Sequence, residues 1–365
     1  MASEKPVVVV TGIAGNLGSR LLPLLGDFSV IGVDVSPPHD DLLLRHPIQF
    51  ERLDLGEESS TRTLYELFRD THPVSIVHLA FVIDAVRSGV LNTERMWQIN
   101  VAGTARIMEA VTEANRTADT PSRQFIFPSS VSVYGPSLPG AATEDSVLAA
   151  HTLPYAIHKK QSDEVVQQRA SALRGCSVYI LRPHIFAGAS VENYLLGAFR
   201  GTVNGKSARA DKMRAEGKRL PCMLPRGQEY LDNKIQFVHV DDMARLIAHI
   251  LHRDPEAKRL TVLNVAGRGE ALTYGRCIEV AQAKLIQVPG KWAMRFVLQL
   301  LWNLKISAIP PEALPYMTGE YIMNTDRLRS FLGGAYEHVI RYSIAEAFED
   351  SFKKPSESAQ GASAT

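Results

Sequence analysis

Cysteine is scarce in this chain. Its 365 residues include only three, Cys176, Cys222 and Cys277. They are far apart, odd in number and without CxxC spacing, which argues against both a disulfide framework and a zinc site. We therefore predict no metal site and a reducing, cytoplasmic setting.

An excess of one charge and long apolar runs are also missing. Lys and Arg number 40 against 39 Asp and Glu, so no global field attracts nucleic acid or an anionic membrane. No window reaches the roughly 18 consecutive apolar residues of a membrane span, and we do not expect the N-terminus to be a secretory signal, because it runs directly into an apolar strand. One apolar segment, "WAMRFVLQLLWNL" (292–304), could lie on a membrane or pack onto the protein, and we predict a core or lid helix.

Short apolar runs alternate with helix-length spacers through the first half of the chain. Because strands that are buried on both faces have nearly continuous apolar sequences, this pattern predicts an α/β fold with a doubly wound parallel sheet. "TVLNVAG" (261–267) predicts a seventh strand, and "IQFVHV" (235–240) predicts a short separate one. The first six predicted strands are "PVVVVTG", "FSVIGVD", "IQFERLD", "SIVHLAF", "RQFIFPSS" and "CSVYILRP".

A glycine-rich turn, "TGIAGNLG" (11–18), joins the first predicted strand to the first predicted helix. Glycine allows a tight turn and the close approach of the backbone to a pyrophosphate, and the helix N-terminus offers unpaired N–H groups to negative charge. We expect Pro23 to kink this helix. The turn predicts a dinucleotide site formed by Gly12, Gly15, Asn16, Leu17 and Gly18.

Asp34 ends the second predicted strand, 22 residues beyond Gly12. That is close to the roughly 20 residues expected for the carboxylate that binds the adenosine ribose. A carboxylate there repels a 2′-phosphate, so the sequence predicts NAD rather than NADP. Asp54 is a candidate for the adenine edge. The predicted cofactor site also includes Leu55, Leu79 and Ala80.

Tyr155 and Lys159 are four residues apart in "PYAIHKKQ" (154–161). On a helix they lie on one face about one turn apart, so one ligand could contact both side chains. Helices also carry such pairs by chance, and the spacing is a weak signal by itself.

Several motifs in one order give a stronger signal. The order resembles that of the extended short-chain dehydrogenase/reductases, the NAD-dependent epimerase/dehydratase family, over almost the whole chain before the tail. The motifs are TGxxGxxG, Asp34, "HLAF" (78–81), "NVAGT" (100–104), "SSVSVYG" (129–135), YxxxK, "LRP" (181–183) and "FVHVDDMA" (237–244).

The resemblance implies roles for individual residues. Tyr155 would be the general base, and Lys159 would bind the nicotinamide ribose and, with the positive nicotinamide, lower the pKa of Tyr155. Ser130 would orient the substrate oxygen, with Ser132 as the alternate. Asn100 matches the asparagine that the family carries on the cofactor side of the site.

Two departures from the family pattern limit which reaction and substrate we expect. Its dehydratases carry an Asp-Glu pair where this chain has Val131 and Ser132, which disfavours dehydration. Its sugar-nucleotide epimerases usually carry an Asn where this chain has Ile185, which puts a nucleotide sugar as the substrate in doubt.

The basic segment 200–234, with nine Lys or Arg and four Asp or Glu, could compensate for the missing Asn by binding phosphate. We expect most of its charges to be solvated. The candidate substrate contacts are Arg209, Arg219, Arg226, His184, Asn193 and His239.

Together these features predict a Rossmann domain and a smaller C-terminal substrate-binding lobe. The predicted enzyme is an NAD-dependent epimerase that oxidises and re-reduces a secondary alcohol of a sugar or nucleotide sugar. The alternatives are a dehydrogenase or reductase of a non-nucleotide alcohol or carbonyl, and a non-catalytic NAD-sensing protein. By resemblance, the helices 93–111 and 155–173 predict a homodimer. The expected units are 1–185 plus 234–268 (NAD-binding), 186–233 plus 269–352 (substrate-binding) and 353–365 (disordered tail).

Overall fold

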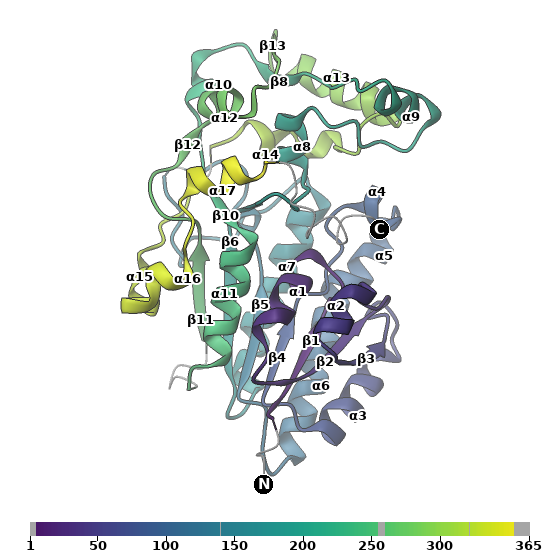
Figure 1. Ribbon diagram of the computed structural model, residues 1–365, viewed down its shortest axis with the longest axis vertical. Helices are drawn as coiled ribbons and strands as arrows, with labels where there is room; N and C mark the ends of the chain where they lie inside the picture. The colour runs from purple at the N-terminus through teal and green to yellow at the C-terminus, as the bar shows by residue number, and fades with distance from the viewer. Residues whose placement is uncertain (1–4, 139, 255–259, 321, 354–365) are drawn as a thin grey trace.

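A seven-stranded, all-parallel sheet forms the centre of the molecule (Figure 1). The computed structural model describes residues 5–138, 140–254, 260–320 and 322–353. The strand order is β11-β6-β5-β4-β1-β2-β3, which confirms the doubly wound sheet and its seventh strand. The strands are β1 (Val7–Thr11), β2 (Ser29–Asp34), β3 (Gln49–Arg52), β4 (Ser75–His78), β5 (Gln124–Pro128), β6 (Ser177–Pro183) and β11 (Leu260–Val265).

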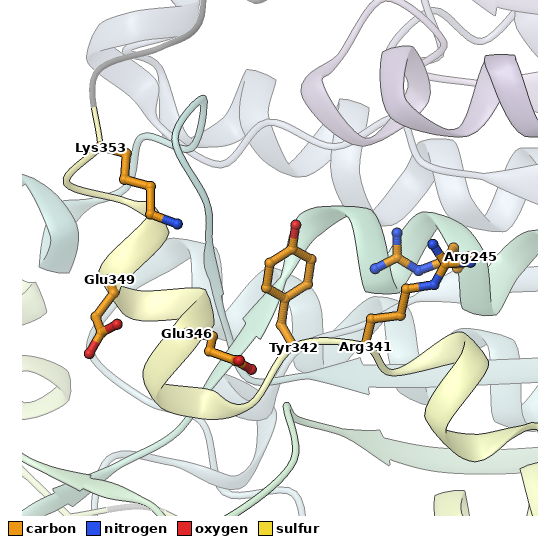
Figure 2. Close-up of a pocket in the computed structure, with 6 residues that line it drawn as sticks. All are labelled: Arg245, Arg341, Tyr342, Glu346, Glu349 and Lys353. Atoms are coloured by element: carbon orange, nitrogen blue, oxygen red, sulfur yellow. The ribbon is translucent and has the colours of Figure 1, made fainter.

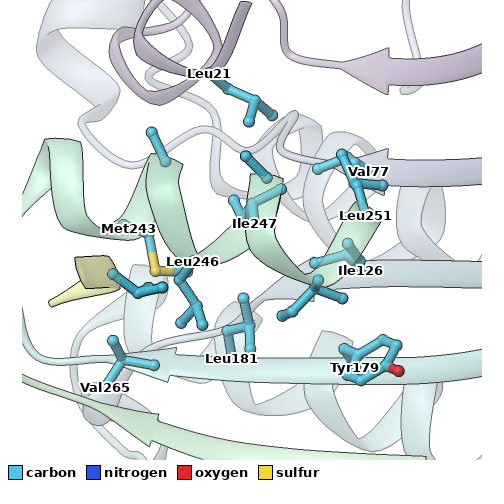
Figure 3. Close-up of a cluster of buried hydrophobic side chains, with 14 of the residues drawn as sticks. Leu21, Val77, Ile126, Tyr179, Leu181, Met243, Leu246, Ile247, Leu251 and Val265 are labelled. Atoms are coloured by element: carbon cyan, nitrogen blue, oxygen red, sulfur yellow. The ribbon is translucent and has the colours of Figure 1, made fainter. Parts of the chain in front are cut away.

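Both faces of the sheet are covered by helices, because successive side chains of each strand point to opposite faces. In β1, Val8 and Val10 pack in one apolar core, which Figure 3 shows in part, and Val9 packs in the other. The first core receives α1 (Asn16–Leu21), α11 (Val240–Leu251), α15 (Asp326–Leu332) and α16 (Tyr336–Val339). The second receives α3 (Ser60–Thr71), α6 (Gly103–Thr117) and α7 (Pro154–Arg169).

The strand order reverses at β1, which lies between β2 and β4. In open α/β sheets, ligands bind beyond the carboxyl ends of the strands at such a switch point. The loops after β1, β2 and β4 therefore meet at the edge where the glycine turn and Asp34 are found.

A smaller group of elements lies beyond that edge, at the top of Figure 1. Its strands form two-stranded sheets, β8 with β13 and β9 with β12, while β7 pairs with β10 below them. The strands are β7 (Ile185–Ala187), β8 (Cys222–Pro225), β9 (Lys234–Ile235), β10 (Phe237–His239), β12 (Leu272–Thr273) and β13 (Leu285–Val288). The helices are α8 (Tyr194–Arg200), α9 (Ala208–Ala215), α10 (Gln228–Asp232), α12 (Tyr274–Ala281), α13 (Lys291–Asn303), α14 (Leu314–Thr318) and α17 (Ile344–Asp350).

Two local predictions were wrong, and one predicted helix contains an irregular turn. Pro23 does not kink the first helix: α1 ends at Leu21, and Pro23 lies in the 3₁₀ turn Leu22–Leu24. The segment "IQFVHV" falls in two strands that pair with different partners, β9 with β12 and β10 with β7, and the Gln236 side chain between them hydrogen-bonds the backbone of Met323 in both directions. The helix predicted over 93–111 is confirmed: α5 (Thr93–Trp97) continues through a π-helical turn (Gln98–Ala102) into α6 without a break.

The remaining sequence expectations concern cysteines, membrane spans and the tail. All three cysteines are free and buried. Within the described ranges, no helix is both long and apolar enough to cross a membrane. Of the tail predicted to be disordered, only Lys353 is among the described residues.

Candidate active site

The glycine turn passes directly under the end of β4. Gly12 has φ +72°, and a Cβ at this position would lie 2.4 Å from the Ala80 nitrogen, so only glycine fits. A Cβ on Gly18 would lie 2.5 Å from the Ile13 carbonyl oxygen. Gly15 caps the N-terminus of α1, and a Cβ there would meet only the Gly12 oxygen, at 3.2 Å. The outer side of the turn is therefore open to a close backbone contact with a pyrophosphate, which fits NAD.

Asp34 joins the end of β2 to this turn. One carboxylate oxygen accepts a hydrogen bond from the Ala14 amide at 3.0 Å, and the other accepts from the Val35 amide at 2.7 Å. Burial raises the pKa of this carboxyl group, while the backbone hydrogen bonds act in the opposite direction. A carboxylate offers about four acceptor positions, so Asp34 can also accept from ribose hydroxyls.

The other predicted cofactor residues have varied surroundings. The Asn16 side chain donates to the Ser190 carbonyl oxygen at 3.1 Å, and Leu17 packs against two apolar cores. Asp54 pairs with Arg95 at 2.5 Å. The Leu55 side chain is buried in the core beneath the sheet edge, so only its backbone is available to a ligand. Leu79 and Ala80 form the backbone that crosses Gly12.

Ser130, Tyr155 and Lys159 come together beyond the end of β5. The Ser130 side chain acts on the Tyr155 hydroxyl group to lower its pKa, and Ser132 Oγ donates to Ser130 Oγ at 3.0 Å. The Lys159 ammonium donates to the Pro128 carbonyl oxygen at 2.7 Å. Because β5 ends at Pro128 and α7 carries Tyr155 and Lys159 one turn apart, two elements are enough to build the cluster.

Burial dominates the electrostatics of this cluster. It lowers the pKa of Lys159 to about 7, against a smaller opposing effect of the Asp163 carboxylate. Burial also raises the pKa of Tyr155, and the Ser130 side chain opposes that rise. The protein by itself thus does not produce the lowered tyrosine pKa that the sequence led us to expect, because desolvation disfavours the phenolate.

Phe81 is the neighbour that sequence reasoning missed. The Lys159 nitrogen lies 3.6 Å from the centroid of the Phe81 ring and 4.9 Å from that of Phe127. The Phe81 ring also meets Tyr155 edge-on, with the centroids 6.0 Å apart. Phe81 was visible in "HLAF" only as part of a motif, and nothing local indicated that its ring faces an ammonium group.

Comparisons with known proteins agree with this geometry. The sequence model of the NAD dependent epimerase/dehydratase family matches residues 8–266. This chain belongs to the NAD-dependent epimerase/dehydratase family. It is therefore an NAD-dependent enzyme of the extended short-chain dehydrogenase/reductase type.

Individual relatives are distant. An uncharacterised epimerase/dehydratase of Staphylococcus saprophyticus is 26% identical over 164 residues, which are 44% of this chain and 47% of the relative. The chain thus matches about half the length of that curated relative. MoeE5 in complex with UDP-glucuronic acid and NAD is 18% identical, with a TM-score of 0.64 over 94% of this chain and 97% of that one. UDP-glucuronic acid 4-epimerase from Bacillus cereus, in complex with UDP-glucuronic acid and NAD, is 17% identical, with a TM-score of 0.63 over 95% and 98%. These structures share the fold.

In this family member, Asn100 lies in the π-helical turn and holds the loop after β4. Its side-chain oxygen accepts from the Val82 amide at 2.7 Å, and its side-chain nitrogen donates to the Val82 carbonyl oxygen at 3.0 Å. Its backbone carbonyl oxygen accepts from the Ser162 hydroxyl of α7 at 3.1 Å. Asn100 therefore links the loop that carries Phe81 to the helix that carries Tyr155 and Lys159.

A buried ion pair holds α7 against the sheet. Arg182 on β6 donates to both oxygens of Asp163 on α7, at 2.9 and 3.0 Å, and the Ser129 hydroxyl donates to Asp163 at 2.6 Å. Arg182 also donates to the Tyr134 hydroxyl at 2.8 Å, which in turn donates to Asn264 on β11. This network explains the arginine of "LRP": it fixes the helix that carries Tyr155 and Lys159.

The residues predicted to contact the substrate differ in their surroundings. Asn193 caps α8, and His239 pairs with Asp350 at 3.1 Å and stacks on Tyr342, so both side chains have structural partners. His184 is buried and accepts from the Ile185 amide. Arg209, Arg219 and Arg226 are exposed, and the described residues provide no ion-pair partner for them.

An apolar wall adjoins Tyr155 on the side of the smaller lobe. Tyr155 and Ile185 pack against a cluster that includes Val131, Leu314 and Met317. Ile185, at the position where the family's epimerases carry an asparagine, is thus part of an apolar surface.

A surface pocket of about 300 Å³ lies elsewhere (Figure 2). None of its lining residues is a predicted site residue, and the pocket is not part of the candidate active site. The lining residues are Arg245, Arg341, Tyr342, Glu346, Glu349 and Lys353.

Proposed function

We propose that this NAD-dependent enzyme oxidises a secondary alcohol to a ketone and re-reduces it, as an epimerase does, with Tyr155 as the general base. The observation that carries the proposal is the position of Tyr155 and Lys159 one turn apart on α7, with the Lys159 ammonium bonded to Pro128 at the end of β5, the strand that leads to Ser130. Proton transfer requires a base and an orienting donor within hydrogen-bond reach of one substrate oxygen.

Each side chain has a defined task in this proposal. Bound NAD would supply the hydride acceptor for the substrate carbon and, as NADH, the donor for its re-reduction. The Tyr155 phenolate takes the proton of the substrate hydroxyl, and the Ser130 hydroxyl donates to the same oxygen. Protonated Lys159 favours the phenolate through its charge. Ser132 donates to Ser130 and so holds its oxygen in place.

The residues around the glycine turn would hold the cofactor. Gly12, Gly15 and Gly18 allow the pyrophosphate to approach the backbone, and Asp34 accepts from the adenosine ribose. Phe81 covers the Lys159 ammonium, so we expect its ring to move aside when the nicotinamide ribose reaches Lys159. Asn100 anchors the loop on which that ring sits.

A nucleotide sugar is the first substrate class to test. MoeE5 and the Bacillus cereus epimerase share the fold and were solved with UDP-glucuronic acid. A diphosphate would need cationic partners, and Arg209, Arg219 and Arg226 are free of ion pairs among the described residues. The second candidate is dehydrogenation of a non-nucleotide alcohol, and the apolar surroundings of Ile185 beside Tyr155 favour it.

The Tyr155→Phe variant tests the proposed base. It keeps the ring and its packing, so NAD should bind as before while turnover falls by at least about a hundredfold, the low end of general-base contributions. Tyr316→Phe is the matched control: Tyr316 contributes to the same apolar cluster, but its hydroxyl bonds the His151 backbone. Equal turnover of wild type and Tyr155→Phe would reject Tyr155 as the base.

The substrate classes are separated by ligand protection and product analysis. A nucleotide-sugar enzyme should be stabilised thermally by UDP, by an amount that grows with RT ln(1 + [L]/Kd), and should yield an epimer without net NADH. A dehydrogenase of a non-nucleotide alcohol should show no protection by UDP and should accumulate NADH. Bound NAD with neither product would favour the NAD-sensing alternative.

A further inference from the structure

The outer side of α13 exposes large apolar side chains in a row. Trp292 is 73% exposed, Phe296 66% and Leu300 47%. They recur every fourth residue and therefore share one side of the helix. We refer to these three residues as the α13 stripe. Single exposed apolar residues are ordinary, whereas a row that includes Trp and Phe marks an interaction surface.

The opposite side of α13 is firmly packed. Met294 and Leu298 are buried in the cluster that contains Leu314 and Met317. The segment before α9 packs on the end of α13: the Gly205 amide donates to the Ile306 carbonyl oxygen at 2.9 Å, and the Ser207 hydroxyl donates to the Lys305 carbonyl oxygen at 3.0 Å. The helix cannot rotate to bury the stripe without losing these contacts. The stripe is thus a fixed feature of the surface.

Basic residues outnumber acidic residues in the two segments around the stripe. Residues 284–305 contain four Lys or Arg and no Asp or Glu, and residues 200–234 contain nine against four, although the whole chain is balanced at 40 to 39. Lys206, Arg209, Arg295 and Lys305 are exposed and form no ion pair with any described residue. Figure 1 shows α13 and α9 at the same end of the molecule. The excess of Lys and Arg in these two segments therefore lies at the same end of the molecule as the α13 stripe.

We propose that this face, the α13 stripe with its flanking Lys and Arg residues, binds the surface of an anionic lipid bilayer. Aromatic and leucine side chains enter the boundary between headgroups and acyl chains, while Lys and Arg attract anionic headgroups. The 13 residues of α13 cannot cross a bilayer, so the helix lies in the plane of the interface. A second copy of the chain is a poorer occupant, because self-association through this face would bring two basic surfaces together.

Vesicle co-sedimentation of the full-length protein tests the proposal. Wild type should bind vesicles of phosphatidylcholine with phosphatidylserine more tightly than vesicles of phosphatidylcholine alone, and added salt should weaken the difference. The double variant W292S/F296S should lower the partition coefficient by at least about tenfold, since two apolar side chains no longer enter the interface. The double variant R295Q/K305Q should reduce binding only to the phosphatidylserine vesicles.

Leu44→Ser provides the matched control. Leu44 is 82% exposed on the short helix α2 (Asp40–Arg45), on the main sheet's side of the molecule, and its replacement should leave vesicle binding unchanged. NAD binding by every variant verifies that the fold is intact. Equal partitioning of wild type and W292S/F296S would overturn the proposal. Absence of vesicle binding, with W292S/F296S converting an oligomer into monomers in sedimentation, would overturn it in favour of a second copy of the chain.

Discussion

Replacing Lys159 by methionine should make the protein more stable, and the gain should depend on pH. The pKa of Lys159 falls from 10.5 to about 7, with burial as the largest cause. A shift of that size means that the free energy of unfolding is lower by about 5 kcal/mol when Lys159 is protonated in the folded protein. Methionine has a similar length and no charge, so Lys159→Met removes that cost.

The sign follows from proton binding. Between pH 7 and the ordinary lysine pKa, the unfolded chain holds a proton that the folded chain lacks, so wild-type stability rises with pH through this window. Below pH 7 both states are protonated, and the full cost is present. The advantage of Lys159→Met should therefore be largest below pH 7 and fall by about 5 kcal/mol as the pH approaches the ordinary lysine pKa.

Urea unfolding of NAD-free protein, from about pH 6 to about pH 10, measures this difference. Lys160→Met is the control, because Lys160 is partly exposed and lies 3.8 Å from Glu164. A difference between wild type and Lys159→Met that stays constant over this range would refute the reasoning. It would mean that the Pro128 carbonyl oxygen and the Phe81 ring compensate the ammonium for its lost water.

Two further predictions concern the cofactor and the assembly. Asp34→Ala should weaken the preference for NAD(H) over NADP(H), because the charge that repels a 2′-phosphate is gone; titration with both cofactors measures this, and tighter NADP binding by wild type would contradict it. Sedimentation should show a twofold dimer, with α6 and α7, which pack side by side, as the expected interface; a monomer at micromolar concentrations would exclude it.

Local sequence was enough to predict the sheet and the glycine turn. The runs that became β1, β2, β4, β5 and β6 are short and apolar, as expected of strands that are buried on both faces. Gly12 could be placed because its φ of +72° and its contact with the Ala80 backbone exclude every side chain. The break near Gln236 was missed, because the Gln236 side chain bonds Met323, a residue far along the chain.

The α13 segment marks the limit of sequence reasoning about burial. Its sequence is apolar on most sides, so it fitted a core or lid helix as well as a membrane surface. Only the packing of Met294 and Leu298 decided which side is covered, and it left Trp292 and Phe296 in contact with solvent.

The sequence by itself determined the parallel sheet, the glycine turn, Asp34 at the end of β2, and the helix that presents Tyr155 and Lys159 together. These features depend on spacing within one or two elements, where backbone geometry fixes which residues are neighbours. Only the tertiary structure placed Phe81 over the Lys159 ammonium and joined Asp163 to Arg182. Such contacts connect different strands and helices. The pKa of Lys159 is set mainly by the burial of its ammonium group, and burial is a property of the whole fold.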